Sequence, residues 1–194
     1  VYNSDVSLDT SATWPMYKYD AQHTSYNPTA SVPNDVSVHW RYTSCAEVES
    51  GVTVFDGRVY PGQLLLNGKD GTRITGEWQA YQRPAVANGT LYVGGHALDA
   101  YNATTGDELW TFNPDGNAGA VSPPTIHQDT VYIAGNVDDR KVYAIDAATG
   151  SEQWRFSPKT NCDTPPAVSG NTLYVVDEAG TIYALDATTG EEQW

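Results

Sequence analysis

The chain has 194 residues, of which 40% are apolar and 11% aromatic, as is typical of one globular domain and not of a disordered segment. Its formal net charge is −14, with 24 acidic residues against ten Lys and Arg. Nucleic acids and anionic membrane surfaces attract proteins of the opposite sign, so we expect no nucleic-acid partner. No apolar run is long enough to span a bilayer, and we therefore expect no membrane insertion.

Short apolar runs rich in Val, Ile, Tyr and Thr follow one another along the chain. They are separated by Asn-Gly, Gly-Asn and Thr-Gly pairs. Such runs and pairs predict strands joined by tight hairpin turns. No stretch carries apolar residues at helical spacing over three turns, so the sequence predicts an all-β protein.

The first recurring phrase has the form Pro-x-x-x-x-x-Thr-x-Tyr. Its copies lie at Pro84 to Val93, Pro124 to Ile133 and Pro166 to Val175, and a looser version lies at Gly51 to Tyr60. We expect each phrase to contain the innermost strand of a repeated sheet, the turn that follows it and part of the second strand.

The second recurring phrase follows the first and ends on tryptophan. Its form is Ala-x-Asp-x-x-Thr-Gly-x-Glu-x-Trp, with Asn102 in place of Asp in the first copy. The residues that define it are Ala100, Thr105, Gly106 and Trp110, then Ala144, Asp146, Thr149, Gly150 and Trp154, and then Ala184, Asp186, Thr189, Gly190 and Trp194. The Asp side chain accepts hydrogen bonds from nearby backbone amides, and Gly adopts the positive φ of a tight return. The phrase therefore predicts the turn between the third strand and the outer strand.

Tryptophan marks the period of the repeat. The markers are Trp40, Trp78, Trp110, Trp154 and Trp194, at spacings of 38, 32, 44 and 40 residues. About 40 residues is the length of one four-stranded propeller blade. In the third unit we expect strands at 120–127, 130–135, 141–146 and 152–157. Because a single sheet cannot bury both its faces, we expect each motif Trp to lie against the neighbouring blade.

The second phrase resembles the tryptophan-docking motif of the pyrroloquinoline-quinone-like β-propellers, also called quinoprotein-like repeats. The match is strong at Ala144 to Trp154 and at Ala184 to Trp194, and good at Ala100 to Trp110. In the first unit only the turn is kept, because Trp78 follows Gly71 by seven residues. The segment Trp14 to Tyr26 resembles the leader that precedes the first blade in this family.

The resemblance implies a leader over residues 1–36 and a partial β-propeller over 37–194. We expect four-stranded antiparallel blades at about 43–80, 81–113, 114–157 and 158–194. Five Trp markers accompany only four inner-strand phrases, so residues 37–42 are expected to be a closing strand that completes a last blade. We therefore interpret the chain as the N-terminal part of a longer ring, which in this family has eight blades. Open sheet edges favour a homo-oligomer in which two half rings pair.

The acidic composition favours a halophilic protein. Excess carboxylates with only four Lys keep a chain soluble by self-repulsion, a property of halophilic proteins. An ordinary acidic secreted protein is the alternative. Members of the family are mostly exported, so the resemblance implies an extracellular or cell-envelope location.

The two cysteines, Cys45 and Cys162, do not define a disulfide framework. Blades one and four of a large ring are too far apart for the Cα separation of about 4.4–6.8 Å that a disulfide requires. We expect two unpaired thiols.

Candidate metal and catalytic residues are sparse. The oxygen-rich segment Asn136 to Asp139 is the best calcium candidate, but its two Asp fall short of the six to eight ligands that calcium takes, so a solvated turn explains it better. The histidines are scattered without metal-ligand spacing, at His23, His39, His96 and His127. We predict no metal site and no catalytic residue.

Two segments satisfy the rule for N-glycosylation, Asn88-Gly89-Thr90 and Asn102-Ala103-Thr104. Both lie at repeat positions whose turn chemistry already explains Asn and Thr. We therefore favour a structural role for both.

Three functions remain open. The first is a non-enzymatic propeller that acts as a binding or scaffold module in the cell envelope or outside the cell, with an unidentified protein or small-molecule ligand and no cofactor. The second is the N-terminal half of a quinone-dependent alcohol or sugar dehydrogenase. The resemblance implies that this enzyme would use pyrroloquinoline quinone with calcium and two adjacent cysteines, and here the two cysteines are 117 positions apart. The third is the sensor domain of a receptor or kinase. We favour the first.

Overall fold

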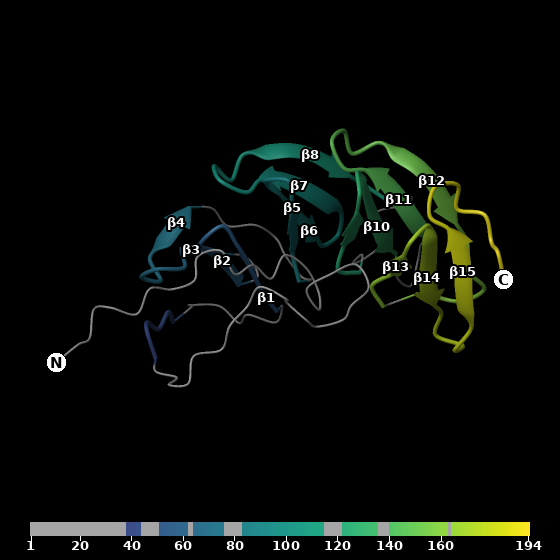
Figure 1. Ribbon diagram of the computed structural model, residues 1–194, viewed down its shortest axis with the longest axis horizontal. Helices are drawn as coiled ribbons and strands as arrows, with labels where there is room; N and C mark the ends of the chain where they lie inside the picture. Colours follow the sequence, from purple (N-terminus) through teal and green to yellow (C-terminus); the bar gives the residue numbers. More distant parts are fainter. Residues whose placement is uncertain are drawn as a thin grey trace.

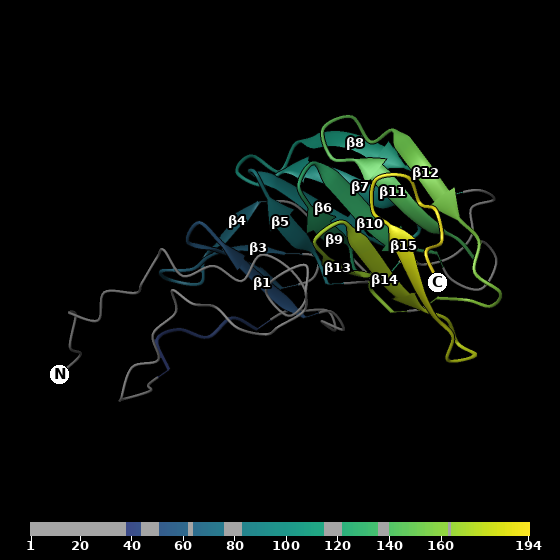
Figure 2. The same cartoon turned by 45° about the vertical axis from the view of Figure 1, so that its right-hand side comes forward.

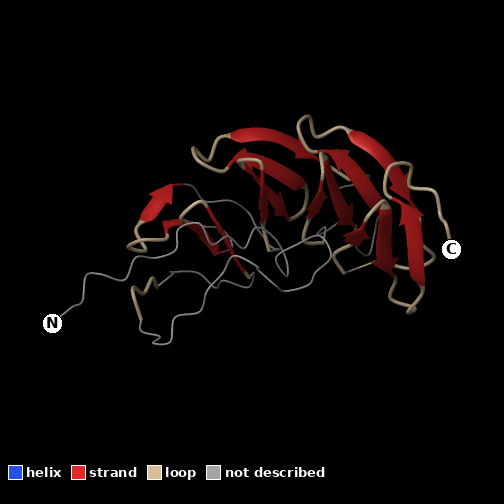
Figure 3. Cartoon of the chain, viewed as in Figure 1, coloured by secondary structure: helices blue, strands red, loops and turns tan. Residues whose placement is uncertain are grey.

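The computed structural model describes residues 38–43, 51–61, 64–75, 83–114, 122–135, 140–162 and 164–194. All regular structure in these ranges is β-strand (Figure 3). Within the same ranges there is no helix with the length and apolar character needed to cross a membrane. The predicted all-β fold class is confirmed.

The strands form four antiparallel sheets, here named the first to fourth sheet in chain order. The first sheet contains β1 (Val52–Phe55), β2 (Arg58–Pro61), β3 (Leu65–Asn67) and β4 (Arg73–Thr75). The second contains β5 (Ala85–Ala87), β6 (Thr90–Gly94), β7 (Leu98–Asn102) and β8 (Glu108–Phe112). The third contains β9 (Thr125–His127), β10 (Thr130–Ala134), β11 (Val142–Asp146) and β12 (Glu152–Phe156). The fourth contains β13 (Ala167–Ser169), β14 (Thr172–Val176) and β15 (Ile182–Asp186).

Every sheet is a simple up-and-down meander, because neighbouring strands in each sheet are consecutive in the chain. Two-residue turns join the first and second strands. In the second sheet the turn is Asn88-Gly89, with φ of 50° and 75°. Both residues of such a turn need positive φ, which is why Asn-Gly is its preferred sequence.

The outer strands carry a β-bulge near their first residues. In the second and third sheets the register shifts just after Ala100 and Ala144, which lie opposite Trp110 and Trp154. In the fourth sheet the outer position holds only an isolated bridge between Leu185 and Glu192. The fourth sheet therefore has three strands and the beginning of a fourth.

The four sheets follow one another in an arc, with β1–β4 at one end and β13–β15 at the other (Figures 1 and 2). The first strands of neighbouring sheets contact one another along the inner side of the arc. There the buried hydroxyls of Thr53 and Thr125 donate to the carbonyls of Pro84 and Pro166, which directly precede the first strand of the next sheet, at 2.5 and 2.6 Å. The apolar core lies between successive sheets. This is the radial stacking of a β-propeller.

Candidate functional site

The turn before the outer strand is closed by its Asp or Asn side chain. In the third sheet Asp146 Oδ1 accepts the backbone N–H groups of Ala148 and Thr149, at 3.1 and 2.8 Å, and the Thr149 hydroxyl at 2.8 Å. The hydrogen bonds from Thr149 hold the pKa of the Asp146 carboxyl below its usual value, since they favour the charged form. Gly150 follows at φ 72° and returns the chain toward the outer strand.

The same closure occurs in the neighbouring sheets. Asn102 Oδ1 accepts the N–H groups of Thr104 and Thr105, and Asp186 Oδ1 accepts those of Thr188 and Thr189. An amide oxygen replaces the carboxylate oxygen at Asn102 without loss of either bond. Asn102 therefore acts as a turn residue, whether or not its sequon is used.

Each motif tryptophan in the second and third sheets lies against the turn of the next sheet. The Trp110 indole donates to the carbonyl of Ala147 at 3.1 Å, and the Trp154 indole donates to the carbonyl of Ala187 at 3.0 Å. A Cβ at Gly150 would lie 2.6 Å from the Trp110 ring, and one at Gly190 would lie 2.6 Å from the Trp154 ring. The glycine is thus needed twice, for its positive φ and for the close approach of the indole.

A tyrosine on the second strand joins each indole at the same acceptor. Tyr92 donates to the Ala147 carbonyl at 3.2 Å, and Tyr132 donates to the Ala187 carbonyl at 3.1 Å. Their rings lie 5.8 and 5.9 Å from those of Trp110 and Trp154. We call this arrangement the Tyr–Trp clamp: a tyrosine hydroxyl and an indole from one sheet on one carbonyl of the next. This role of the recurring Tyr was not predicted from the sequence, although the fixed place of the Tyr in the first phrase was a signal.

The first sheet shows parts of the same arrangement. Tyr60 donates to the Ala103 carbonyl of the second sheet at 3.0 Å, and burial raises the pKa of its hydroxyl to about 12, so the proton stays in place. The indole of Trp40 donates to the Gly68 carbonyl of the first sheet at 2.8 Å and lies over Gly71. Trp40 belongs to residues 38–43, which include residues 38–42 of the expected closing strand. They form no strand pairing with any described residue.

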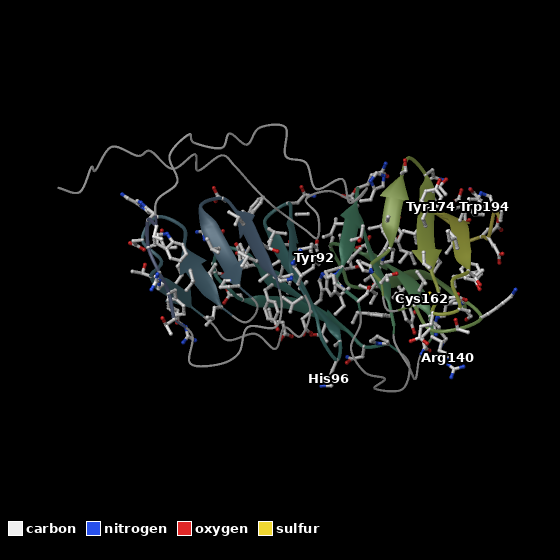
Figure 4. The ribbon with its side chains drawn as sticks, turned by 90° about the horizontal axis from the view of Figure 1, so that it is seen from below. Tyr92, His96, Arg140, Cys162, Tyr174 and Trp194 are labelled. Atoms are coloured by element: carbon white, nitrogen blue, oxygen red, sulfur yellow. The ribbon has the colours of Figure 1, made fainter. Side chains whose placement is uncertain are left out.

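The fourth sheet carries the tyrosine and the tryptophan of a clamp, but no described residue supplies the acceptor carbonyl. Tyr174 and Trp194 lie side by side at the end of the arc, with ring centroids 6.4 Å apart (Figure 4). Trp194 is 64% exposed, whereas Trp154 is 8% exposed. Among the residues predicted for the docking motif, those of the Asp-x-x-Thr-Gly part lie in turns, and Trp110 and Trp154 take part in clamps. Ala100, Ala144 and Ala184 lie in β7, β11 and β15, where Ala100 and Ala144 pair with Trp110 and Trp154. In the fourth sheet no described residue covers Tyr174 and Trp194.

The other candidate residues are dispersed. His39 Nε2 lies 3.0 Å from the Lys69 carbonyl, and His96 is exposed on the loop after β6. His127 ends β9, and Asn88 is exposed in its turn. The part of the chain that the structure describes contains no group of three or more His, Cys, Asp and Glu able to hold a metal ion.

Several predictions fall outside the described residues. They concern His23, Cys45, Trp78, the segment Asn136 to Asp139, and the leader segment over 1–36. Cys162 is buried, and because Cys45 lies outside the described residues the prediction of two unpaired thiols remains a prediction.

The comparisons with known proteins point to one family. Residues 94–194 match the family described as "Outer membrane protein assembly factor BamB". The chain belongs to this family. The match begins at the end of β6, so it spans β7 and β8 of the second sheet and the whole third and fourth sheets, and it includes all three docking motifs. The predicted resemblance to quinoprotein-like repeats is confirmed.

Solved structures share the fold of this BamB-family chain. Quinohemoprotein alcohol dehydrogenase ADHIIG from Pseudomonas putida HK5 is 19% identical, with a TM-score of 0.77 over 94% of this chain and 39% of its own. The quinohemoprotein alcohol dehydrogenase of Comamonas testosteroni is 19% identical, with a TM-score of 0.75 over 94% of this chain and 40% of its own. BamB from Moraxella catarrhalis is 15% identical, with a TM-score of 0.67 over 81% of this chain and 54% of its own. The chain thus spans about two fifths to one half of these proteins. No curated protein sequence matches it.

Proposed function

We propose that this propeller module is a non-enzymatic binding or scaffold unit of the cell envelope or the extracellular space. One observation carries the proposal: the polar and aromatic side chains repeated from unit to unit close turns and join sheets. The family description, an outer membrane protein assembly factor, agrees with such a role and with an envelope location.

The surface for a partner lies where the strand ends of all four sheets gather, on the side that carries the turns between the first and second strands and between the third and outer strands. Backbone bonds such as those from Ala103 N to Gly89 O and from Ala147 N to Asp129 O place both kinds of turn at the same end of each sheet. This end carries the acidic turn residues Asp56, Asp70, Asp107, Asp129, Asp146 and Asp186. It would fit a partner with a basic surface, because opposite charges steer association.

Site-specific photo-crosslinking in the native envelope tests the binding role. A photoreactive residue replaces Asp129 or Asp107 at the acidic end, and Arg140 serves as the matched exposed position on the loop between β10 and β11 at the opposite end. We expect a discrete protein adduct from the acidic end and none from Arg140. Recovery of the protein outside the envelope fraction and the culture medium, or equal adducts from both ends, would contradict the proposal.

A quinone-dependent dehydrogenase is the second candidate, and the shared fold with two quinohemoprotein alcohol dehydrogenases favours it. Pyrroloquinoline quinone and Ca²⁺ are added to the protein, and dye-linked alcohol oxidation and the absorbance of the quinone are followed. We expect no turnover and no absorbance change. Turnover that requires both additions would replace the scaffold proposal by the enzymatic one.

A further inference from the structure

Both N-glycosylation segments of the chain lie at one end of one sheet. Asn88-Gly89-Thr90 spans the turn between β5 and β6, and Asn102-Ala103-Thr104 begins the turn between β7 and β8. The two turns touch, because the backbone N–H of Ala103 donates to the carbonyl of Gly89 at 2.9 Å. The sequence contains no other Asn-x-Ser/Thr segment in which x is not proline. Both acceptors that the chain offers therefore lie together on the second sheet.

Asn88 has the exposure and the freedom that an attached glycan needs. It is exposed, and no group within the described ranges forms a hydrogen bond with its side chain. A Cβ at Gly89 would have no atom within 4 Å apart from those of its chain neighbours, so the space beside the turn is open. The turn requires only positive φ at this position, which Asn88 adopts at 50° and the equivalent Asp56 of the first sheet at 47°. The backbone role of Asn88 therefore leaves its amide nitrogen free.

Asn102 lacks that freedom. It is half-buried, and its Oδ1 accepts the N–H groups of Thr104 and Thr105 at 2.8 and 2.9 Å, which fixes the plane of the amide. The next residue, Ala103, is only 3% exposed. A glycan is bulky and belongs on the surface, so a side chain that closes the turn is the poorer acceptor.

We propose that Asn88 carries an N-linked glycan and that Asn102 does not. The proposal rests on the envelope or extracellular location proposed above, because the donor is a lipid-linked oligosaccharide used by an oligosaccharyltransferase during export. The Nδ2 atom of Asn88 forms a bond with the anomeric carbon of the first sugar, and the bond between that carbon and the phosphate oxygen of the lipid breaks. One amide proton passes to a base of the transferase, and the lipid phosphate leaves.

A glycan on Asn88 leaves the acidic surface of the third sheet to a partner. The carboxylates of Asp129 and Asp146 have no counterpart in the second sheet. Gly89 takes the equivalent place of the first, and Asn102 that of the second. The glycan therefore lies over a part of this end that lacks both carboxylates, and a protein with a basic surface can still approach them.

Peptide mass spectrometry tests the assignment on the protein purified from the envelope fraction or the culture medium of its own cells. Cleavage after Tyr92 separates Asn88 from Asn102. We expect the Asn88 peptide to gain the mass of an oligosaccharide and the Asn102 peptide to keep the mass of its sequence. An Asn88 peptide without added mass, or a glycan on Asn102 in its place, would overturn the proposal.

Four variants expressed in the same cells separate the acceptor from the fold. Asn88→Asp should lose the added mass and keep the turn, since Asp56 occupies the equivalent position at nearly the same φ. Thr90→Ala should lose the added mass as well, whereas the matched Thr90→Ser keeps the glycosylation segment and should retain the mass. Thr104→Ala removes only the second segment and should have no effect on the added mass. Added mass that survives in Asn88→Asp, or that is lost in Thr104→Ala, would also overturn the assignment.

The fraction that contains the protein is recorded in the same preparations. An unmodified Asn88 in protein from the envelope or the medium overturns the glycan alone. A protein found in neither fraction, with Asn88 unmodified, contradicts both the glycan and the proposed location. The binding role is tested separately by the crosslinking experiment.

Discussion

At the scale of single residues, the contact between sheets depends on a glycine, because any larger residue would place a Cβ against the indole. The indole of Trp110 can reach the Ala147 carbonyl only because residue 150 has no Cβ. The same residue has φ 72°, so two independent physical requirements fall on one glycine. The first is a backbone requirement and the second a packing requirement, and substitutions can separate them.

Gly150→Ala should destabilise the protein more than Gly170→Ala. Both glycines have positive φ, at 72° and 60°, and the left-handed conformation costs an L-residue about 1–2 kcal/mol. Only at Gly150 would the new Cβ also meet the Trp110 ring, and such overpacking costs about 1–3 kcal/mol more. At Gly170 no atom lies within 4 Å of that position. Urea unfolding of the two variants measures the difference, and equal losses would contradict the packing role.

Trp154→Phe should lower the free energy of unfolding, whereas Trp194→Phe should leave it within about 0.5 kcal/mol of the wild type. The first change removes the indole donor to the Ala187 carbonyl and part of a buried ring, worth about 1–3 kcal/mol together. The second changes a ring that is 64% exposed. The comparison is made at low salt by urea unfolding. A similar loss in both variants would mean that burial by the next sheet adds nothing.

At the scale of the element, the turn before the outer strand is stabilised by a carboxylate that works best when charged. Hydrogen bonds within the turns lower the pKa of Asp146 and of Asp70, for Asp70 chiefly the one from the Thr72 hydroxyl. A carboxyl group whose pKa is lowered by folding stabilises the protein above its unfolded value of 3.8. That stabilisation is lost as the pH falls through the lower folded value.

Asp146→Asn should therefore flatten the dependence of stability on pH below about 4 while keeping most of the stability at neutral pH. The amide oxygen can accept the same backbone N–H groups, as Asn102 does in the second sheet. The control is Asp129→Asn, because the Asp129 side chain accepts no hydrogen bond in the part of the chain described here. Melting temperatures from neutral to acidic pH measure the slope. An unchanged slope in Asp146→Asn would show that this carboxylate does not contribute.

Much of the architecture could be predicted from the sequence because the same pattern of strands and turns recurs in several units. The third unit, expected at 120–127, 130–135, 141–146 and 152–157, forms β9 to β12 at 125–127, 130–134, 142–146 and 152–156. The shared acceptor of the Tyr–Trp clamp could not be predicted, since it joins residues 55 positions apart, such as Tyr132 and Ala187. Residues 37–42 were predicted to be a strand, but the described residues 38–43 form none. A strand must pair with a neighbouring strand, and the sequence of the segment alone does not identify that neighbour.

At the scale of the whole molecule, the surface charge opposes the compact state. The acidic turns lie at one end of every sheet, so the arc brings like charges of successive sheets near one another. Exposed charges repel over about 8 Å at physiological ionic strength and over about 3 Å in molar salt. Folding gathers these charges, and salt therefore favours the folded chain over the unfolded one.

The melting temperature should rise from dilute buffer to multimolar KCl, as expected of a halophilic protein. Replacing Glu108, Asp129 and Glu192 together by their amides should reduce the slope with salt, because these exposed carboxylates make no hydrogen bond within the described residues while adding to the repulsion. Sucrose, which strengthens apolar burial without screening charge, should stabilise the proteins with and without the three amide substitutions equally. A slope that the amide substitutions leave unchanged would assign the salt effect to apolar burial and support the ordinary acidic secreted protein instead.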